Sequence, residues 1–160
     1  MPSVPELREK LWNALKSDLT VMLGVEASKS TVLRPMTAQF KPSGHKIWFF
    51  TSKDAMISKE LKKSSNSIFT FVSRKHDVFA TVHGTLEIDT DKATLDMLWN
   101  RYVAAWFEKG KEDPKLLLLR MEPKDAEIWL DDSSFFAGIR MMIGLDPKEE
   151  YKDNSAKVKL

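Results

Sequence analysis

A close succession of short β-rich segments, separated by turn residues, is the feature that most restricts the folds open to this chain. Each segment is rich in β-branched and aromatic residues, and clusters of polar residues, Gly or Pro separate one from the next. Residues 20–26 and 31–41, joined by the polar turn 27–30, predict a β-hairpin. The predicted strands comprise residues 20–26, 31–41, 46–52, 67–73, 78–88, 115–121, 126–130 and 156–160.

Helical patterns occur at four places, one before the first predicted strand and three between later strands. The first is the clearest, because Ser3 and Glu6 have the spacing of a capping box. Leu7, Leu11 and Leu15 then form one apolar stripe, which is typical of a helix packed over a sheet. The predicted helices comprise residues 4–17, 54–63, 92–106 and 134–145.

Many short strands with few helices predict a mainly β fold, an antiparallel barrel with helices packed at its ends. The sequence shows no regular alternation of strands and helices and no glycine-rich phosphate loop, so a dinucleotide-binding α/β fold is not expected. A chain of 160 residues suits one domain. We expect that domain to comprise the helix 4–17, a barrel over about 19–131, and a C-terminal helix and tail over 133–160.

Composition narrows the classes of function. The 25 Lys and Arg residues nearly balance the 23 Asp and Glu residues, so there is no general electrostatic reason to expect nucleic-acid binding. No apolar run approaches the roughly 20 residues needed to span a membrane. The N-terminus lacks a basic region followed by an apolar stretch, which favours a cytoplasmic location.

The residue types needed for unaided catalysis are also scarce. There is no cysteine, which excludes disulfides, thiol nucleophiles and thiolate metal sites. The three histidines have no ligand spacing, so no metal site is expected. No serine stands in a nucleophile-elbow motif. An enzyme of this composition would therefore need a cofactor for difficult chemistry.

The segment around Arg34 is the first candidate for a binding site. Period-two alternation places Arg34 and Met36 on one face of the predicted strand. An arginine on a largely apolar face needs an anionic partner or a route to solvent. Two interpretations stay open, a bound ligand anion and a carboxylate of the chain itself. Pro35 cannot donate to a strand ladder, which indicates an edge or a bulge that would leave room for a ligand.

Two further segments combine aromatic and polar residues. Thr51 and Ser52 lie where a predicted strand runs into a predicted helix, so their hydroxyls and the free backbone N–H groups could hold a phosphate. Trp106 and Phe107 form an aromatic pair at the end of another predicted helix. A flat amphipathic ring would stack well on such a pair.

Taken in order, these motifs resemble the general-stress branch of the pyridoxamine 5'-phosphate oxidase-like flavin-binding split barrels. The resemblance covers about residues 20–129, and each motif alone is less specific than the ordered set. The matching motifs are LRPM at 33–36, IWFFTS at 47–52, VHG at 82–84, LW at 98–99, AWF at 105–107, DPKLLLLR at 113–120 and AEIW at 126–129.

The resemblance implies a six-stranded split barrel that forms a two-fold homodimer, with flavin mononucleotide (FMN) in each of two interfacial clefts. Arg34 matches the family's phosphate-binding arginine, whose planar fork suits bidentate contact. Residues 35–37 match the strand beside the isoalloxazine ring, residues 50–52 match the segment that holds the ribityl chain and phosphate, and residues 106–107 match a motif near the ring. The implied cofactor-binding residues are Arg34, Pro35, Met36, Thr37, Phe50, Thr51, Ser52, Ser58, Lys59, Trp106 and Phe107.

The chain departs from the family pattern after Thr51. Met56 and Ile57 stand where family members often carry basic residues, and Ser58 and Lys59 one turn later are the expected substitutes. A charged hydrogen bond contributes about 1.5–3 kcal/mol, so each lost contact would weaken flavin binding about tenfold to a hundredfold. We therefore expect a weaker flavin site that purifies partly empty.

The resemblance leaves the activity open. Gln39 stands where true pyridoxamine phosphate oxidases place a lysine, so vitamin B6 oxidation is not expected. One interpretation is an oxidoreductase that moves hydride or electrons between a nicotinamide donor and an unknown acceptor. A second is a flavin-binding protein without turnover, acting as a store or a stress-responsive sensor. A third keeps the barrel with a deazaflavin or haem, although no histidine is a convincing haem ligand.

Overall fold

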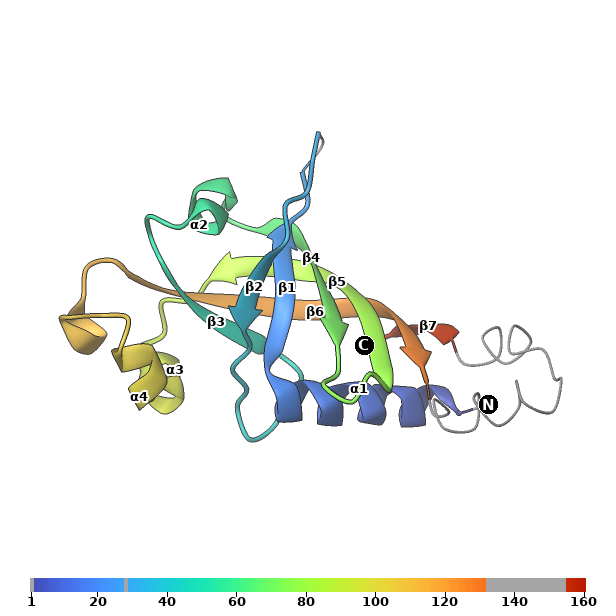
Figure 1. Cartoon of the computed structure of the whole chain (residues 1–160). Helices are drawn as coiled ribbons and strands as arrows, with labels where there is room; N and C mark the ends of the chain where they lie inside the picture. The colour runs from blue at the N-terminus through green and yellow to red at the C-terminus, as the bar shows by residue number, and fades with distance from the viewer. Residues whose placement is uncertain (1, 28, 132–154) are drawn as a thin grey trace, which may run out of the picture.

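A strongly curved antiparallel sheet of seven strands forms the centre of the structure (Figure 1). The computed structural model describes residues 2–27, 29–131 and 155–160. The strand order is β2–β1–β4–β5–β6–β3, and β7 also pairs with β6. The strands are β1 (Thr20–Val25), β2 (Arg34–Thr37), β3 (Ile47–Ser52), β4 (Ser65–Val72), β5 (Val78–Ile88), β6 (Leu116–Leu130) and β7 (Ser155–Lys159).

The two ends of the sheet approach each other without closing. An isolated bridge between Gln39 and Trp48 joins the segment after β2 to β3, with backbone N···O distances of 2.8 and 2.9 Å. No continuous ladder connects β2 to β3 among the described residues, so the barrel is split at this seam. The expected mainly β split barrel with flanking helices is confirmed. The predicted hairpin of the first two strands is confirmed as well, because β1 and β2 pair antiparallel.

The longest strand corrects one prediction. Residues 115–121 and 126–130 are not two strands but parts of the single 15-residue strand β6. A bulge lets the strand continue through Pro123, since His83 pairs with Asp125 and Gly84 pairs with Pro123. Gly84 is required at this bulge, because a Cβ there would lie 2.9 Å from the carbonyl carbon of Glu122 and still closer to its oxygen.

The N-terminal helix closes one side of the core, as predicted. In α1 (Val4–Asp18), the Glu6 N–H donates to the Ser3 hydroxyl (3.4 Å) and the Ser3 N–H donates to the Glu6 carboxylate (2.6 Å). The apolar stripe of α1 is buried in one core cluster with side chains from the sheet. Figure 1 shows the helix lying across one end of the curved sheet. Its buried residues are Leu7, Leu11, Trp12 and Leu15.

Three other predictions were too long. The helix predicted over 92–106 is two short helices, α3 (Lys92–Leu98) and α4 (Arg101–Ala104). The Asn100 side chain starts the second helix, because it accepts hydrogen bonds from the N–H groups of Tyr102 (3.0 Å) and Val103 (3.1 Å). The helix predicted over 54–63 is reduced to α2 (Met56–Glu60). The strand predicted over 31–41 is reduced to β2. Beyond its end, the Ala38 N–H donates to the Leu19 carbonyl (2.6 Å) and Gln39 forms the isolated bridge with Trp48.

The C-terminal predictions have different outcomes. The terminal strand predicted over 156–160 is confirmed as β7, which pairs with the second half of β6. The helix predicted over 134–145 lies outside the described residues. A short 3₁₀ turn, η1 (Gly110–Glu112), precedes β6. Within the described part of the chain, no helix is long and apolar enough to cross a membrane.

Replacing Gly84 with alanine tests the bulge. We expect Gly84→Ala to lower the free energy of unfolding by about 1–3 kcal/mol, because the new methyl group overlaps the backbone of Glu122. Urea denaturation measures this, with Thr81→Ala on the same strand as a control expected to cost less than about 1 kcal/mol. Equal losses in the two variants would contradict the argument.

Candidate functional site

A cavity of about 790 Å³ opens between β2, β3, α4 and the turn before β6. Its volume is within the range of small-molecule and cofactor sites. The residues that line it come from segments far apart in the sequence. They are Pro35, Met36, Thr37, Gln39, Phe50, Thr51, Ser52, Ala55, Tyr102, Val103, Trp106, Phe107, Glu108, Lys109, Asp113, Pro114 and Lys115.

Aromatic residues form one wall of the cavity. Phe50 in β3 meets Trp99 edge-to-face at 6.0 Å between ring centroids, and Trp99 meets Phe107 at 6.4 Å. These contacts hold the two cavity-lining phenylalanines in place from behind. Trp106 and Tyr102 at the lip are 85% and 71% exposed, although both are large aromatic residues. The Tyr102 ring lies against the Arg101 guanidinium, 5.1 Å from ring centroid to Cζ. The wall therefore offers a fixed apolar surface inside and two exposed aromatic side chains outside.

Polar residues also line the cavity. Thr37, Thr51 and Ser52 contribute hydroxyl groups. Ser52 is held in a turn, because its hydroxyl accepts from the Asp54 N–H (3.2 Å) and its carbonyl accepts from the Ser58 hydroxyl (2.7 Å). The arrangement suits a ligand with one flat apolar part and one hydroxylated or charged part.

Charged residues lie at the rim, in the turn before β6. The backbone N–H of Lys115 donates to the Asp113 carboxylate (2.9 Å) and holds the pKa of Asp113 below its ordinary value. Asp113 also accepts from the N–H of Lys109 (3.3 Å), so the carboxylate orders the turn that carries both lysines. The Lys115 ammonium group lies 3.4 Å from the carboxylate of Asp54.

Arg34 is engaged outside the cavity lining. Its guanidinium donates through Nη2 to Oε1 of Glu60 (2.8 Å) and through Nη1 to Oε2 (3.2 Å). The hydrogen bond from Arg34 lowers the pKa of Glu60, and the same pair raises the pKa of Arg34. Of the two interpretations of Arg34, the structure shows the intramolecular carboxylate.

The structure brings most of the expected site residues together. Three of the expected residues do not line the cavity, namely Ser58, Lys59 and Arg34. The Ser58 hydroxyl donates to the Ser52 carbonyl, and Lys59 is exposed on α2. Met56 is exposed and Ile57 is buried in the core, so neither lines the cavity. The expected residues that line it are Pro35, Met36, Thr37, Phe50, Thr51, Ser52, Trp106 and Phe107.

The sequence interpretation missed the charged turn before β6 as part of the site. In the register of β3 and β6, Ser52 pairs with Leu116, and the Lys53 N–H donates to the Lys115 carbonyl (2.8 Å). This pairing places residues 113–115 beside the end of β3. Asp113 and Lys115 belong to a motif that resembled the family, but their sequence position alone does not place them near Ser52.

Comparison with known proteins places the chain among relatives over most of its length. The family model described as "Pyridoxamine 5'-phosphate oxidase like" matches residues 6–151. General stress protein 26 of Bacillus subtilis (strain 168) is 27% identical over 92 residues, which cover 56% of this chain. The chain spans 65% of that relative's length.

Two solved structures from Xanthomonas are more similar. The general stress FMN/FAD binding protein of Xanthomonas citri is 52% identical, with a TM-score of 0.76 over 84% of this chain and 95% of that one. A chain from Xanthomonas campestris pv. campestris is also 52% identical, with a TM-score of 0.78 over 86% of this chain and 96% of that one. Both similarities extend well beyond the cavity-forming segments.

Proposed function

This chain belongs to the pyridoxamine 5'-phosphate oxidase like family, and from that premise we propose that it is a flavin-binding protein of the general stress type. The observation that carries the proposal is the cavity, whose lining combines aromatic residues with the hydroxyl-bearing residues Thr37, Thr51 and Ser52. A flavin has the same division, with a flat ring at one end and a polyhydroxylated chain at the other. The Xanthomonas citri relative, named as an FMN/FAD binding protein, supports the same ligand class.

We propose FMN as the flavin, with the roles divided along the cavity. The backbone of Pro35, Met36 and Thr37 and the rings of Phe50 and Trp106 would hold the isoalloxazine ring. Thr51 and Ser52 would hold the ribityl chain and direct it towards the phosphate end. When bound, the flavin supplies hydride and electron transfer, while these residues bind it, orient it and limit its contact with water.

We propose that the working unit is a homodimer with the flavin at the interface. Trp106 and Tyr102 support this, because large aromatic residues this exposed at the lip of a cavity are typical of a surface covered by a partner. A two-fold interface would use the same patch on both chains. Sedimentation equilibrium should give twice the chain mass of 18.4 kDa. A monomer at micromolar concentration, with flavin bound, would contradict this proposal.

We propose an oxidoreductase activity, in which a nicotinamide donor is oxidised and a small acceptor is reduced. A non-catalytic flavin-binding protein is the second candidate. One observation favours the non-catalytic protein, because all ionisable residues of the cavity lining belong to α4 or to the segment between α4 and β6. They are Tyr102, Glu108, Lys109, Asp113 and Lys115. No histidine is among the lining residues in the described part of the chain, so no side chain stands out as an internal acid or base.

Flavin uptake tests the binding proposal. We expect the purified protein to show a flavin absorption band, or to gain and retain one after FMN is added and the excess removed. Trp106→Ala should raise the FMN dissociation constant about threefold to tenfold, because stacking contributes about 0.5–1.5 kcal/mol.

Met97→Ala is the matched control for Trp106→Ala, since Met97 is 60% exposed on α3 and does not line the cavity. A protein that stays colourless and takes up no FMN would disprove flavin binding. The same titration tests the expected effect of Met56 and Ile57, because a nanomolar dissociation constant for the wild type would show that their lack of charge does not weaken the site.

Anaerobic reduction separates the two candidate functions. If the protein is an oxidoreductase, adding NADH or NADPH without air should bleach the flavin band of the loaded protein within seconds to minutes, as the nicotinamide is oxidised. Dithionite, which reduces accessible flavins chemically, serves as the positive control. A band that persists with both nicotinamides and bleaches with dithionite would favour the non-catalytic protein.

A further inference from the structure

We propose that Glu60 competes with the flavin's phosphate for Arg34, so that the phosphate adds little to affinity and the site binds riboflavin nearly as well as FMN. The inference rests on the proposed flavin-binding function and concerns how the same site recognises its ligand. It assigns to Glu60 a role in ligand specificity.

The contact between the two side chains occupies the end-on face of the guanidinium, formed by its two Nη atoms. Both Nη atoms of Arg34 donate to the two oxygens of Glu60, at 2.8 and 3.2 Å. A phosphate that approached Arg34 end-on would use the same two Nη atoms, and one that approached from the side, through Nε and Nη2, would still share Nη2 with Glu60. The side chains are 25% and 33% exposed, so water screens the pair less than it screens a fully exposed one.

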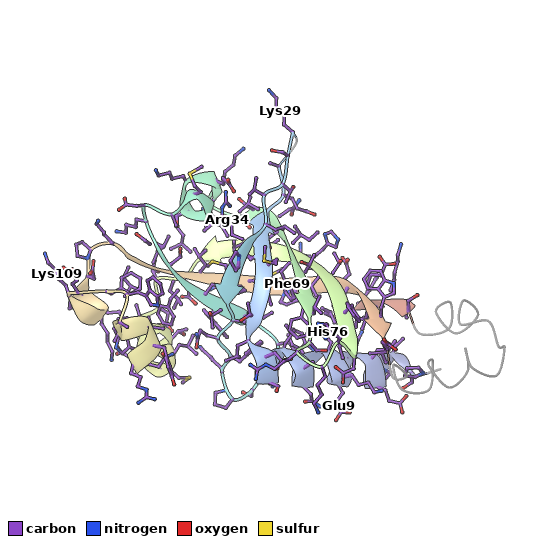
Figure 2. The ribbon with its side chains drawn as sticks, viewed as in Figure 1. Glu9, Lys29, Arg34, Phe69, His76 and Lys109 are labelled. Carbon is purple, nitrogen blue, oxygen red and sulfur yellow. The ribbon has the colours of Figure 1, made fainter. Side chains whose placement is uncertain are left out.

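The ion pair lies beside the cavity without being part of its lining. Arg34 shares a face of β2 with Met36, which does line the cavity, and two residues of a strand span about 7 Å. On the other side, Ala55 lines the cavity immediately before α2, and Glu60 is the last residue of α2. Figure 2 shows Arg34 at the end of β2 that is nearer to α2. A phosphate reaching past Met36 and Ala55 would therefore meet an arginine whose charge Glu60 already balances.

The residues of α2 next to Glu60 add no positive charge to the cavity, whose lining lysines, Lys109 and Lys115, come from the turn before β6 instead. Ile57 is 1% exposed and packs in the core, and Met56 carries no charge. Lys59 is next to Glu60 in sequence, but it is exposed and does not line the cavity. Because Glu60 stays ionised at neutral pH, a phosphate dianion must either displace this carboxylate or bind beside it with like-charge repulsion.

A different role for Glu60 makes the opposite prediction. If Glu60 instead holds Arg34 in the orientation that phosphate requires, it is a positioning residue, and removing its charge would weaken FMN binding. Riboflavin lacks the phosphate, so comparing the two flavins isolates the contribution of Arg34 and its partner from that of the ring and ribityl chain.

Glu60→Gln tests the proposal, with riboflavin and FMN titrated into the wild type and the variant. Glutamine keeps the size of the side chain and can still accept one hydrogen bond from Arg34. In the wild type we expect the two dissociation constants to agree within about threefold. In the variant we expect FMN to bind about tenfold more tightly and riboflavin to bind as before, because Arg34 regains an uncompensated charge.

Glu87→Gln is the matched control, because Glu87 pairs with Arg120 at 3.0 Å with similar exposure, 37% and 27%, and does not line this cavity. It should leave both dissociation constants unchanged. Glu60→Ala provides a second variant with the same expected direction, and unchanged riboflavin binding shows that a variant remains folded.

The outcomes separate this inference from the function it rests on. Weaker or unchanged FMN binding in Glu60→Gln and Glu60→Ala, with riboflavin binding retained, would overturn the competition and leave flavin binding intact. If the wild type bound FMN far more tightly than riboflavin, the proposed competition would be overturned as well. Failure of both flavins to bind the wild type would overturn the proposed function and this inference together.

Discussion

Backbone pairing along β6 is the constraint on which the rest of the structure depends. This strand pairs with β5 along nearly its whole length, with β3 over its first half and with β7 over its second. Its continuity through Pro123 requires the bulge opposite Gly84. Because β3 is aligned on β6, the end of β3 and the turn before β6 lie together, and that junction forms one end of the cavity.

The cavity also depends on the seam where the barrel fails to close. β2 is only four residues long and contributes cavity-lining residues at the edge of the sheet. Pro35 has no N–H to donate, which suits an edge position. Asn100 caps the start of α4, and α4 with the residues that follow it brings Val103, Trp106 and Phe107 to the opening. A closed barrel would have filled this space with side chains.

Several charged side chains around this cavity are engaged by other groups of the chain. Arg34 is balanced by Glu60, Lys115 lies near Asp54, and Asp113 is held by backbone N–H groups in the rim turn. This pairing of charges underlies our proposal that the anionic end of the flavin contributes less to binding than its ring and polyhydroxylated chain.

Local patterns in the sequence were sufficient for the elements that depend on neighbouring residues. The capping box of Ser3 and Glu6, the apolar stripe of α1, and the β-branched and aromatic residues of β3 and β5 act over a few residues, and the structure confirms these elements. The motifs shared with the family also identified the aromatic and hydroxyl residues of the cavity. Tertiary structure alone decided the continuity of β6, the proximity of residues 113–115 to Ser52, and the choice of Glu60 as the partner of Arg34. Arg34 and Glu60 are 26 positions apart, and such partners are set by strand register and by packing between distant segments, which local sequence patterns do not encode.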